Sequence, residues 1–317
     1  MKKKAVVIGG GNGTAITVQA LKCNLDKFDI GAIVSMSDSG GSSGRLRAEF
    51  GVLPPGDILR AILALSAHDY KILRQIFNKI RFSDTGNLNG HNLGNLFLTL
   101  TQNYGASLMD SARALEQAVE AVGRAYPASL DMTDLMAELD NGEIVKTEGA
   151  IDRPSYDRAR KIVKAWLEPA AKIYPATAET IKQADYIFLG PGSLYCSVIA
   201  AILVDGAKEA IAQSQAKLIY IAGNAYEKHG ETGPTVLSDF IKTLEGYLPR
   251  SLDFVIYNNA VLDEAQKKRY MEKNWGMIEY DEDNLGGYSI VAGDYEKAEG
   301  GLDKEKLGEI IRKVADI

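Results

Sequence analysis

The sequence predicts an α/β protein with a mainly parallel β-sheet and one small inserted β-hairpin. Short, continuous apolar runs recur along its 317 residues, as expected for strands buried on both faces of a parallel sheet. Most of these runs end in a loop rich in Gly, Ser or Asn, and stretches with helical periodicity lie between them. Asn141-Gly142 separates two partly alternating runs, which is a hairpin signal.

The N-terminal part predicts a strand–loop–helix–strand unit. Residues 5–8 form the first apolar run, and the glycine loop 9–14 leads into a helix that ends near Leu21. A second strand at residues 30–35 ends in the polar loop 38–45. This order of elements is typical of parallel α/β sheets.

The middle of the chain predicts several helices. A breaker cluster at residues 51–56 precedes Asp57, which we expect to be the N-cap of a helix over residues 58–66. His91 or Asn92 opens another helix. That helix is predicted over residues 93–101, and the remaining ones over residues 69–81, 108–122, 196–203 and 304–317.

The remaining strands are predicted at residues 186–189, 218–222 and 254–257. The β excursion at about 130–155 is an insertion, because α/β units resume after it. We therefore expect residues 1–317 to form a single α/β domain.

Composition excludes several classes of protein. With 46% apolar and 25% charged residues the chain can bury a core, which excludes disorder. The longest apolar run, residues 198–204, is far below the ~20 residues of a membrane span, and the run at 5–8 is too short for an export signal. The net charge of −6 is spread without a basic stripe, so we expect no nucleic-acid partner. The two cysteines form no CxxC pattern, which fits a reducing cytoplasm.

Five polar loops are predicted to meet at one edge of the sheet, because each follows a strand and the carboxyl ends of parallel strands lie at the same edge. Ligands of such folds bind at that edge. Glycines in these loops let backbone N–H groups approach an anion closely. One helix dipole contributes only about 0.3–1 kcal/mol, so several converging loops and an arginine are needed. The loops are residues 9–14, 38–45, 190–195, 223–224 and 258–259.

The first two loops carry different chemistry. Thr14 stands where the dinucleotide fingerprint has its third glycine, and this disfavours an ordinary NAD dehydrogenase. The first loop could still bind a nucleotide, or it could be a simple βα turn without a ligand. In the second loop, Asp38 is an oxygen ligand for magnesium and Arg45 a fork-shaped donor to phosphate. A solvated linker is the alternative there. Asp57 and His91 are as readily structural as functional, and neither a zinc site, a Gly-x-Ser-x-Gly elbow nor a Walker A motif is present.

Five blocks in this order resemble the gluconeogenesis-factor (YvcK-like) branch of the 2-phospho-L-lactate transferase (CofD-like) superfamily. The blocks are residues 7–13, 37–47, 53–58, 90–96 and 189–195. The resemblance implies a cytoplasmic protein with a Rossmann-like three-layer sandwich that binds a nucleotide ligand such as UDP-N-acetylglucosamine. It also implies a link to gluconeogenic growth and cell shape. The YvcK-like members are not established enzymes, whereas the transferase relatives move a phospholactyl group from a nucleotide-activated donor with a divalent metal.

One departure bears on the metal. The family usually has two adjacent Asp residues where this chain has Asp38-Ser39. Asp38 is therefore expected to be the only carboxylate on magnesium, and the metal is expected to bind mainly to the phosphates of a UDP-sugar or NAD. A phosphotransferase with a nucleotide-activated donor remains the alternative to a regulatory binding protein. We expect a small-molecule partner and no membrane partner, with a homodimer left open. The predicted ligand-binding residues are Gly10, Gly11, Asn12, Gly13, Thr14, Asp38, Ser42, Ser43, Arg45, Asp57, His91, Asn92, Asn95, Gly190, Gly192, Ser193 and Asn224.

Overall fold

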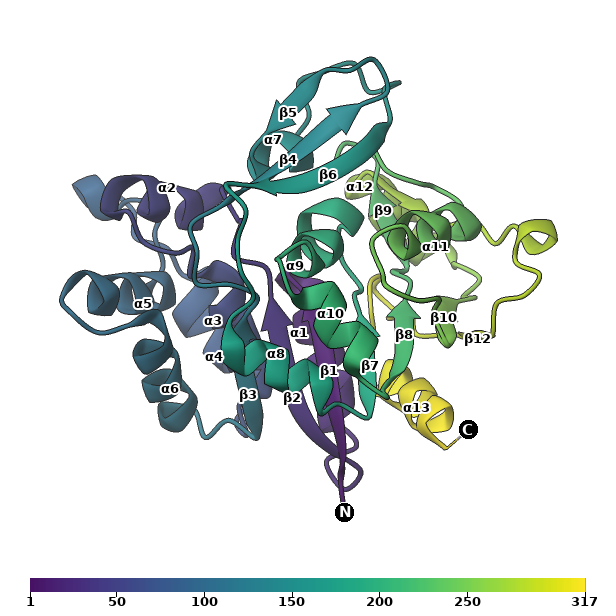
Figure 1. Ribbon diagram of the computed structural model, residues 1–317, viewed down its shortest axis with the longest axis horizontal. Helices are drawn as coiled ribbons and strands as arrows, with labels where there is room; N and C mark the ends of the chain where they lie inside the picture. Colours follow the sequence, from purple (N-terminus) through teal and green to yellow (C-terminus); the bar gives the residue numbers. More distant parts are fainter. Residues whose placement is uncertain (317) are drawn as a thin grey trace.

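A seven-stranded parallel sheet forms the centre of the protein. The structure is a computed structural model and describes residues 1–316. The strand order is β12-β10-β8-β7-β1-β2-β3, and every neighbouring pair is parallel (Figure 1). The predicted α/β fold with a mainly parallel sheet is confirmed. The strands are β1 (Lys3–Gly9), β2 (Phe28–Val34), β3 (Gly123–Pro127), β7 (Tyr186–Leu189), β8 (Lys217–Ile221), β10 (Phe254–Asn258) and β12 (Ile290–Gly293).

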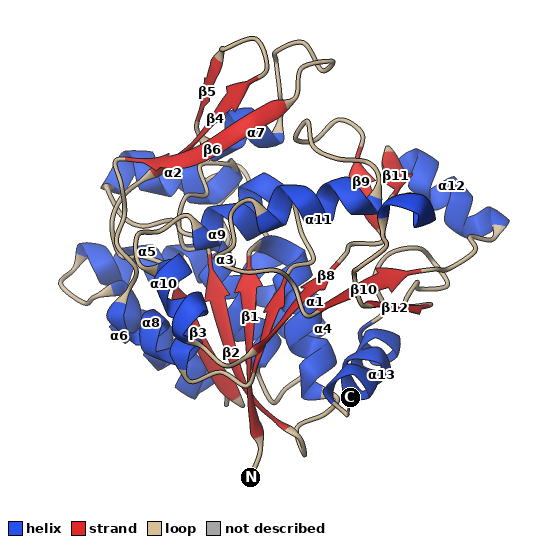
Figure 2. Cartoon of the chain, turned by 45° about the vertical axis from the view of Figure 1, so that its right-hand side comes forward, coloured by secondary structure: helices blue, strands red, loops and turns tan. Residues whose placement is uncertain are grey.

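Helices cover both faces of this sheet and complete the three layers (Figure 2). Alternate residues of β1 divide between two cores, with Ala5 and Val7 in one and Val6 and Ile8 in the other. The Ala5 core takes in helices α1 (Gly11–Lys22), α3 (Gly56–Leu65), α6 (Leu108–Ala118) and α13 (Lys304–Ala315). The Val6 core takes in α8 (Pro175–Lys182), the π-helix η3 (Leu194–Ile199) with α9 (Ala200–Ile202), α10 (Ala207–Gln213) and α11 (Leu237–Glu245).

The strand order reverses beside β1. The chain runs from β1 outward through β2 to β3, and then returns to place β7 on the other side of β1. Ile8 and Leu189 are register partners near the ends of these two strands. The loops that follow them are therefore neighbours at the carboxyl edge, and such a switch point is where open α/β sheets bind ligands.

A small antiparallel sheet lies over this edge, at the top of Figure 1. It consists of β4 (Asp134–Leu139), β5 (Ile144–Lys146) and β6 (Ile162–Glu168), in the order β5-β4-β6. The hairpin predicted around Asn141-Gly142 is confirmed as β4–β5. The third strand, β6, lies beyond the predicted excursion and was missed. A second antiparallel pair is formed by β9 (Ala225–Glu227) and β11 (Trp275–Met277).

Two local predictions near the edge differ in outcome. Asn92 caps α5 (Leu93–Asn103), because its side chain accepts a hydrogen bond from the backbone N–H of Asn95 at 2.8 Å. The expected capping role of Asp57 is wrong: helix α3 begins two residues earlier than predicted, at Gly56 after Pro55, and the Asp57 carboxylate instead pairs with Arg60 at 2.6 Å.

Three further helices surround the site. Residues expected in the polar loop after β2 instead begin α2 (Gly41–Phe50), while α4 (Tyr70–Arg74) continues into the π-helix η1 (Gln75–Lys79). The other short helices are η2 (Gly86–Leu88), α7 (Glu148–Asp152), α12 (Glu264–Glu272) and η4 (Glu282–Asn284). Within residues 1–316, none of these helices is long and apolar enough to cross a membrane.

Candidate functional site

A cavity of about 990 Å³ lies at the carboxyl edge of the parallel sheet. Four of the five predicted loops contribute to its lining, namely those after β1, β2, β7 and β8. The loop after β10 does not. Its Asn258 is buried and donates a hydrogen bond to Glu296 instead.

Most of the predicted ligand-binding residues line this one cavity. Those in the lining are Gly10, Gly11, Asn12, Gly13, Asp38, Ser42, Ser43, Asp57, Asn92, Asn95, Gly192, Ser193 and Asn224. Four predicted residues are not in the lining: Thr14, Arg45, His91 and Gly190. Arg45 is exposed and lies beside Gly90, whereas His91 is buried behind Ser42.

Two glycines of the first loop are required by close approaches. A Cβ on Gly13 would lie 1.9 Å from the carbonyl oxygen of Pro191, so the loops after β1 and β7 touch through backbone. A Cβ on Gly10 would lie 2.5 Å from a carboxylate oxygen of Asp57. The glycine loop therefore allows the loops and a carboxylate to converge on one space.

Three carboxylates gather beside that space. Asp38 follows β2, Asp57 lies in the first turn of α3, and Glu148 begins α7 below the small sheet. Burial, and then the charge of Asp57, raise the pKa of Asp38 to about 6. Burial and the charge of Asp38 raise the pKa of Glu148 to about 8. The negative charges of these carboxylates disfavour one another, and a positive charge bound nearby would reduce that repulsion.

Glu148 reaches this position through Ser39. The backbone N–H of Ser39 donates to the Glu148 carboxylate at 3.3 Å, and the Ser39 hydroxyl accepts from the backbone N–H of Gly149 at 2.8 Å. The sequence-based expectation that Asp38 is the sole carboxylate here, because Ser39 replaces the second Asp, is therefore wrong. Glu148 supplies a second one from a distant part of the chain.

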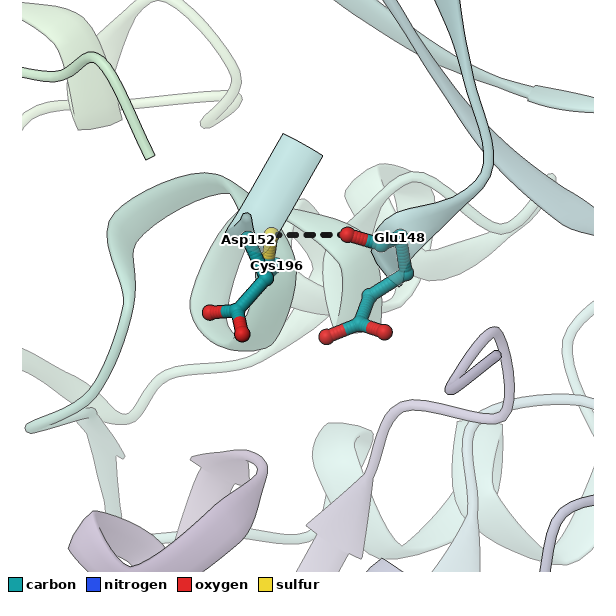
Figure 3. Close-up of side chains that lie close together, drawn as sticks. All are labelled: Glu148, Asp152 and Cys196. Carbon is teal, nitrogen blue, oxygen red and sulfur yellow. Dashed lines mark hydrogen bonds between the residues drawn. The ribbon is translucent and has the colours of Figure 1, made fainter. Parts of the chain in front are cut away.

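Asp152 and Cys196 extend this group. Oxygen atoms of Glu148 and Asp152 and the Cys196 sulfur lie within 4.8 Å of one another. Figure 3 shows both carboxylates directed to the same side, while the thiol faces the backbone carbonyl of Glu148 at 3.8 Å. Burial raises the pKa of Cys196 well above its usual range, so this thiol is protonated and is a poor ligand. The oxygen donors are the ones that fit a cation.

The carboxylate of Glu231 lies at the start of η3, in the loop region after β7 where the sequence predicts a bound anion. Its carboxylate accepts hydrogen bonds from the backbone N–H groups of Leu194, Tyr195 and Cys196, at 3.1 Å from Tyr195 and 3.0 Å from Cys196. These are the free donors at the start of η3. The protein therefore supplies its own anion at this helix end, and the neighbouring Ser193 remains in the cavity wall.

Basic side chains also contribute to the lining of the cavity. Arg158 ties its own segment to the loop after β9, because it donates to the carbonyl oxygens of Gly230, at 3.0 Å, and Lys228. Sequence reasoning missed this group, since these residues follow no buried strand. The basic residues in the lining are Arg60, Arg81, Arg153, Arg158, Arg160, Lys161 and Lys228.

Unpaired polar atoms mark another wall of the cavity. Asn92 Nδ2 and Asn95 Oδ1 are buried and have no hydrogen-bond partner within the described residues 1–316. A buried polar atom without a partner costs about 1–3 kcal/mol, so a bound polar molecule would relieve this cost. The amide of Asn224 is different, because it already donates to Tyr270 and Glu296.

Comparison with known proteins identifies the family. The family described as "2-phospho-L-lactate transferase CofD" matches residues 5–295. The chain belongs to this CofD family. A putative gluconeogenesis factor of Thermotoga maritima is 40% identical over 282 residues, covering 89% of this chain and 87% of that protein. The gluconeogenesis factor of Bacillus subtilis is 32% identical, covering 90% of this chain and 87% of that protein.

A solved CofD-family relative has the same fold. The crystal structure of a UPF0052-family protein from Bacillus halodurans superposes with a TM-score of 0.88 at 32% identity, covering 98% of this chain and 99% of that one. The sequence-based assignment to the gluconeogenesis-factor branch is confirmed by these relatives.

Proposed function

We propose that the cavity of this CofD-family protein binds a nucleotide-activated ligand of the UDP-sugar class together with magnesium, and that binding regulates carbon metabolism. The observation that carries this proposal is the convergence of four strand-end loops and three carboxylates on one cavity of about 990 Å³. That volume lies at the upper end of the ~300–1,000 Å³ typical of small-molecule sites, which suits a ligand as long as a nucleotide sugar.

The charges of the cavity support an anionic ligand bridged by a cation. Asp38, Asp57 and Glu148 would repel a bare diphosphate, whereas Mg²⁺ is usually held by one or two carboxylates and by substrate phosphates. Basic residues of the same lining, including Arg158 and Lys161, would balance the remaining charge. The buried, unpaired amide atoms of Asn92 and Asn95 would supply one donor and one acceptor to a sugar or a base seated against them.

The second candidate function is transfer of a phospholactyl-type group from a nucleotide-activated donor. The observation that favours it is the presence of Glu148 beside Asp38, since this supplies the second carboxylate that Ser39 lacks. Binding and transfer use the same cavity and differ only in turnover.

A thermal-shift screen tests the proposal. UDP-N-acetylglucosamine, NAD and GTP are each added with and without magnesium, at about 100 times the dissociation constant for a true ligand. Binding at that level stabilises by about 2.7 kcal/mol, which corresponds to about 4 °C for a chain of this size. We expect the largest shift with the UDP-sugar and magnesium. No shift with any nucleotide would contradict binding, and formation of a phosphodiester product from an activated phospholactate donor would select the transferase.

A further inference from the structure

We propose that Ser42 is a nucleophile of this cavity and that His91 is its general base, so that the bound phosphoanhydride is cleaved through a covalent phosphoseryl intermediate. The carrying observation is a hydrogen bond of 2.8 Å between Ser42 Oγ and His91 Nδ1, between side chains 49 residues apart in sequence. This inference goes beyond the proposed binding function and rests on it for the identity of the physiological electrophile.

The hydrogen bonds around Ser42 orient its proton. Asn95 Nδ2 donates to Ser42 Oγ at 3.1 Å, and an amide nitrogen can only donate. The hydroxyl hydrogen of Ser42 is therefore free to point at His91 Nδ1 in the tautomer that carries its proton on Nε2, which is the tautomer that a base requires. A nucleophile within hydrogen-bond reach of a base is the arrangement that activates a serine.

The surroundings of His91 keep it ready to accept a proton. The ring is 2% exposed, and burial, followed by the charge of Arg45, lowers the pKa of His91. The imidazole is therefore neutral at neutral pH, as a base must be before it accepts a proton.

Ser42 faces the ligand space, whereas His91 lies behind it. Ser42 is part of the cavity lining at the first turn of α2, a position where the helix dipole favours negative charge. The unpaired Asn92 Nδ2 and Asn95 Oδ1 atoms are in the same wall. Because buried polar atoms normally have a partner, these two unpaired atoms point to a polar group seated beside Ser42.

The chemical step balances with a nucleotide-activated donor as the co-reactant. Ser42 Oγ attacks the donor's distal phosphorus, an Oγ–P bond forms, and the P–O bond to the nucleoside monophosphate breaks. The hydroxyl proton passes to His91 Nδ1 and then to the departing nucleoside monophosphate. An acceptor alcohol or water afterwards displaces Ser42 Oγ from phosphorus, giving up its proton through His91 to the serine oxygen.

A phosphorylating probe tests this without any nucleotide. Diisopropyl fluorophosphate reacts with an activated serine by forming an Oγ–P bond and releasing fluoride. We expect one diisopropylphosphoryl group per native chain, mapped by peptide mass spectrometry to Ser42, and none on Ser42 after unfolding in urea. Ser42→Ala should abolish labelling, whereas Ser251→Ala, which removes an exposed hydroxyl outside the cavity lining, should retain it.

The contribution of His91 is measured as a rate. His91→Gln should slow labelling at least ~100-fold, since general base catalysis typically contributes 10²–10⁴-fold. No adduct on native protein, an adduct elsewhere, or an equal rate in native and unfolded wild type would each overturn the proposal, and the native-to-unfolded comparison holds even where a variant does not fold. UDP-sugar binding without labelling overturns only the nucleophile, and labelling without UDP-sugar binding overturns only the proposed ligand.

Discussion

The carboxylate of Glu148 accepts a hydrogen bond from the backbone N–H of Ser39, at 3.3 Å, across a separation of 109 residues. This contact joins the small antiparallel sheet to the loop that carries Asp38. It places a carboxylate in a buried position beside another carboxylate, where each raises the energy of the other's charge. The repulsion between these two carboxylates destabilises the folded protein, and a bound cation would reduce that repulsion.

Glu148→Gln should change how stability depends on pH. The pKa of Glu148 is raised to about 8 in the folded protein from an ordinary value of 4.5, so the folded state binds the proton more tightly than the unfolded state. The corresponding stability is present at low pH and is lost as pH rises through about 8. We compare the free energy of unfolding by urea, measured in EDTA, between the variant and wild type. The variant minus wild-type difference should be more positive at pH 9 than at pH 5, by roughly 1–3 kcal/mol.

The control for this experiment is Glu143→Gln, which removes an exposed carboxylate from the preceding β4–β5 hairpin. For this control, the free energy of unfolding should change with pH in the same way as it does in wild type. Magnesium should restore part of the wild-type stability at high pH. A Glu148→Gln curve that also runs parallel to wild type would contradict the assigned burial of this charge.

Gly13→Ala should separate the two loops that meet at the switch point. The new Cβ would lie 1.9 Å from the Pro191 carbonyl oxygen, so backbone must move, and overpacking of this kind costs about 1–3 kcal/mol. We expect that loss in urea unfolding, together with loss of nucleotide binding. Gly286→Ala is the matched control, because its Cβ would meet nothing within 4 Å, and it should stay within about 0.5 kcal/mol of wild type.

Glu231→Ala should destabilise the protein, because it strips the start of η3 of its acceptor. The N–H groups of Leu194, Tyr195 and Cys196 would lose their partner, and unsatisfied buried donors cost about 1–3 kcal/mol each. Partial access to water limits the expected loss to roughly 3 kcal/mol in urea unfolding. Glu227→Ala, at an exposed glutamate nearby, should cost much less, and equal losses in the two variants would refute the capping role.

Five of the seven strands of the main sheet could be predicted from local sequence with their loops, because each signal lies within a few residues, whereas the edge strands β3 and β12 were not predicted. The run at residues 5–8 is apolar on both faces, and in β1 the two faces do pack into separate cores. The same reasoning found Asn92 as a helix cap. Most of the cavity-lining glycines, serines and asparagines followed from their positions after these strands.

The parts of the site that sequence could not supply depend on contacts between distant segments. Glu148 and Glu231 act through backbone N–H groups 109 and about 36 residues away, and no local pattern encodes such pairs. Asp57 was assigned a capping role because its residue type favours that position, but helix α3 starts earlier, and the carboxylate pairs with Arg60 in the cavity wall instead. The pairing of Ser42 with His91 likewise appears only when α2 packs against the start of α5.

Calorimetric titration of UDP-N-acetylglucosamine, with and without magnesium, on wild type and on Asp38→Asn tests the central claim most directly. Asp38 lies in the cavity wall among the carboxylates assigned to the cation. In wild type, magnesium should strengthen binding at least tenfold, or about 1.4 kcal/mol. Asp38→Asn should abolish that gain and leave the metal-free affinity equal or higher, because one negative charge near the phosphates is removed. An equal loss of affinity with and without magnesium, or no binding to wild type at all, would contradict the account.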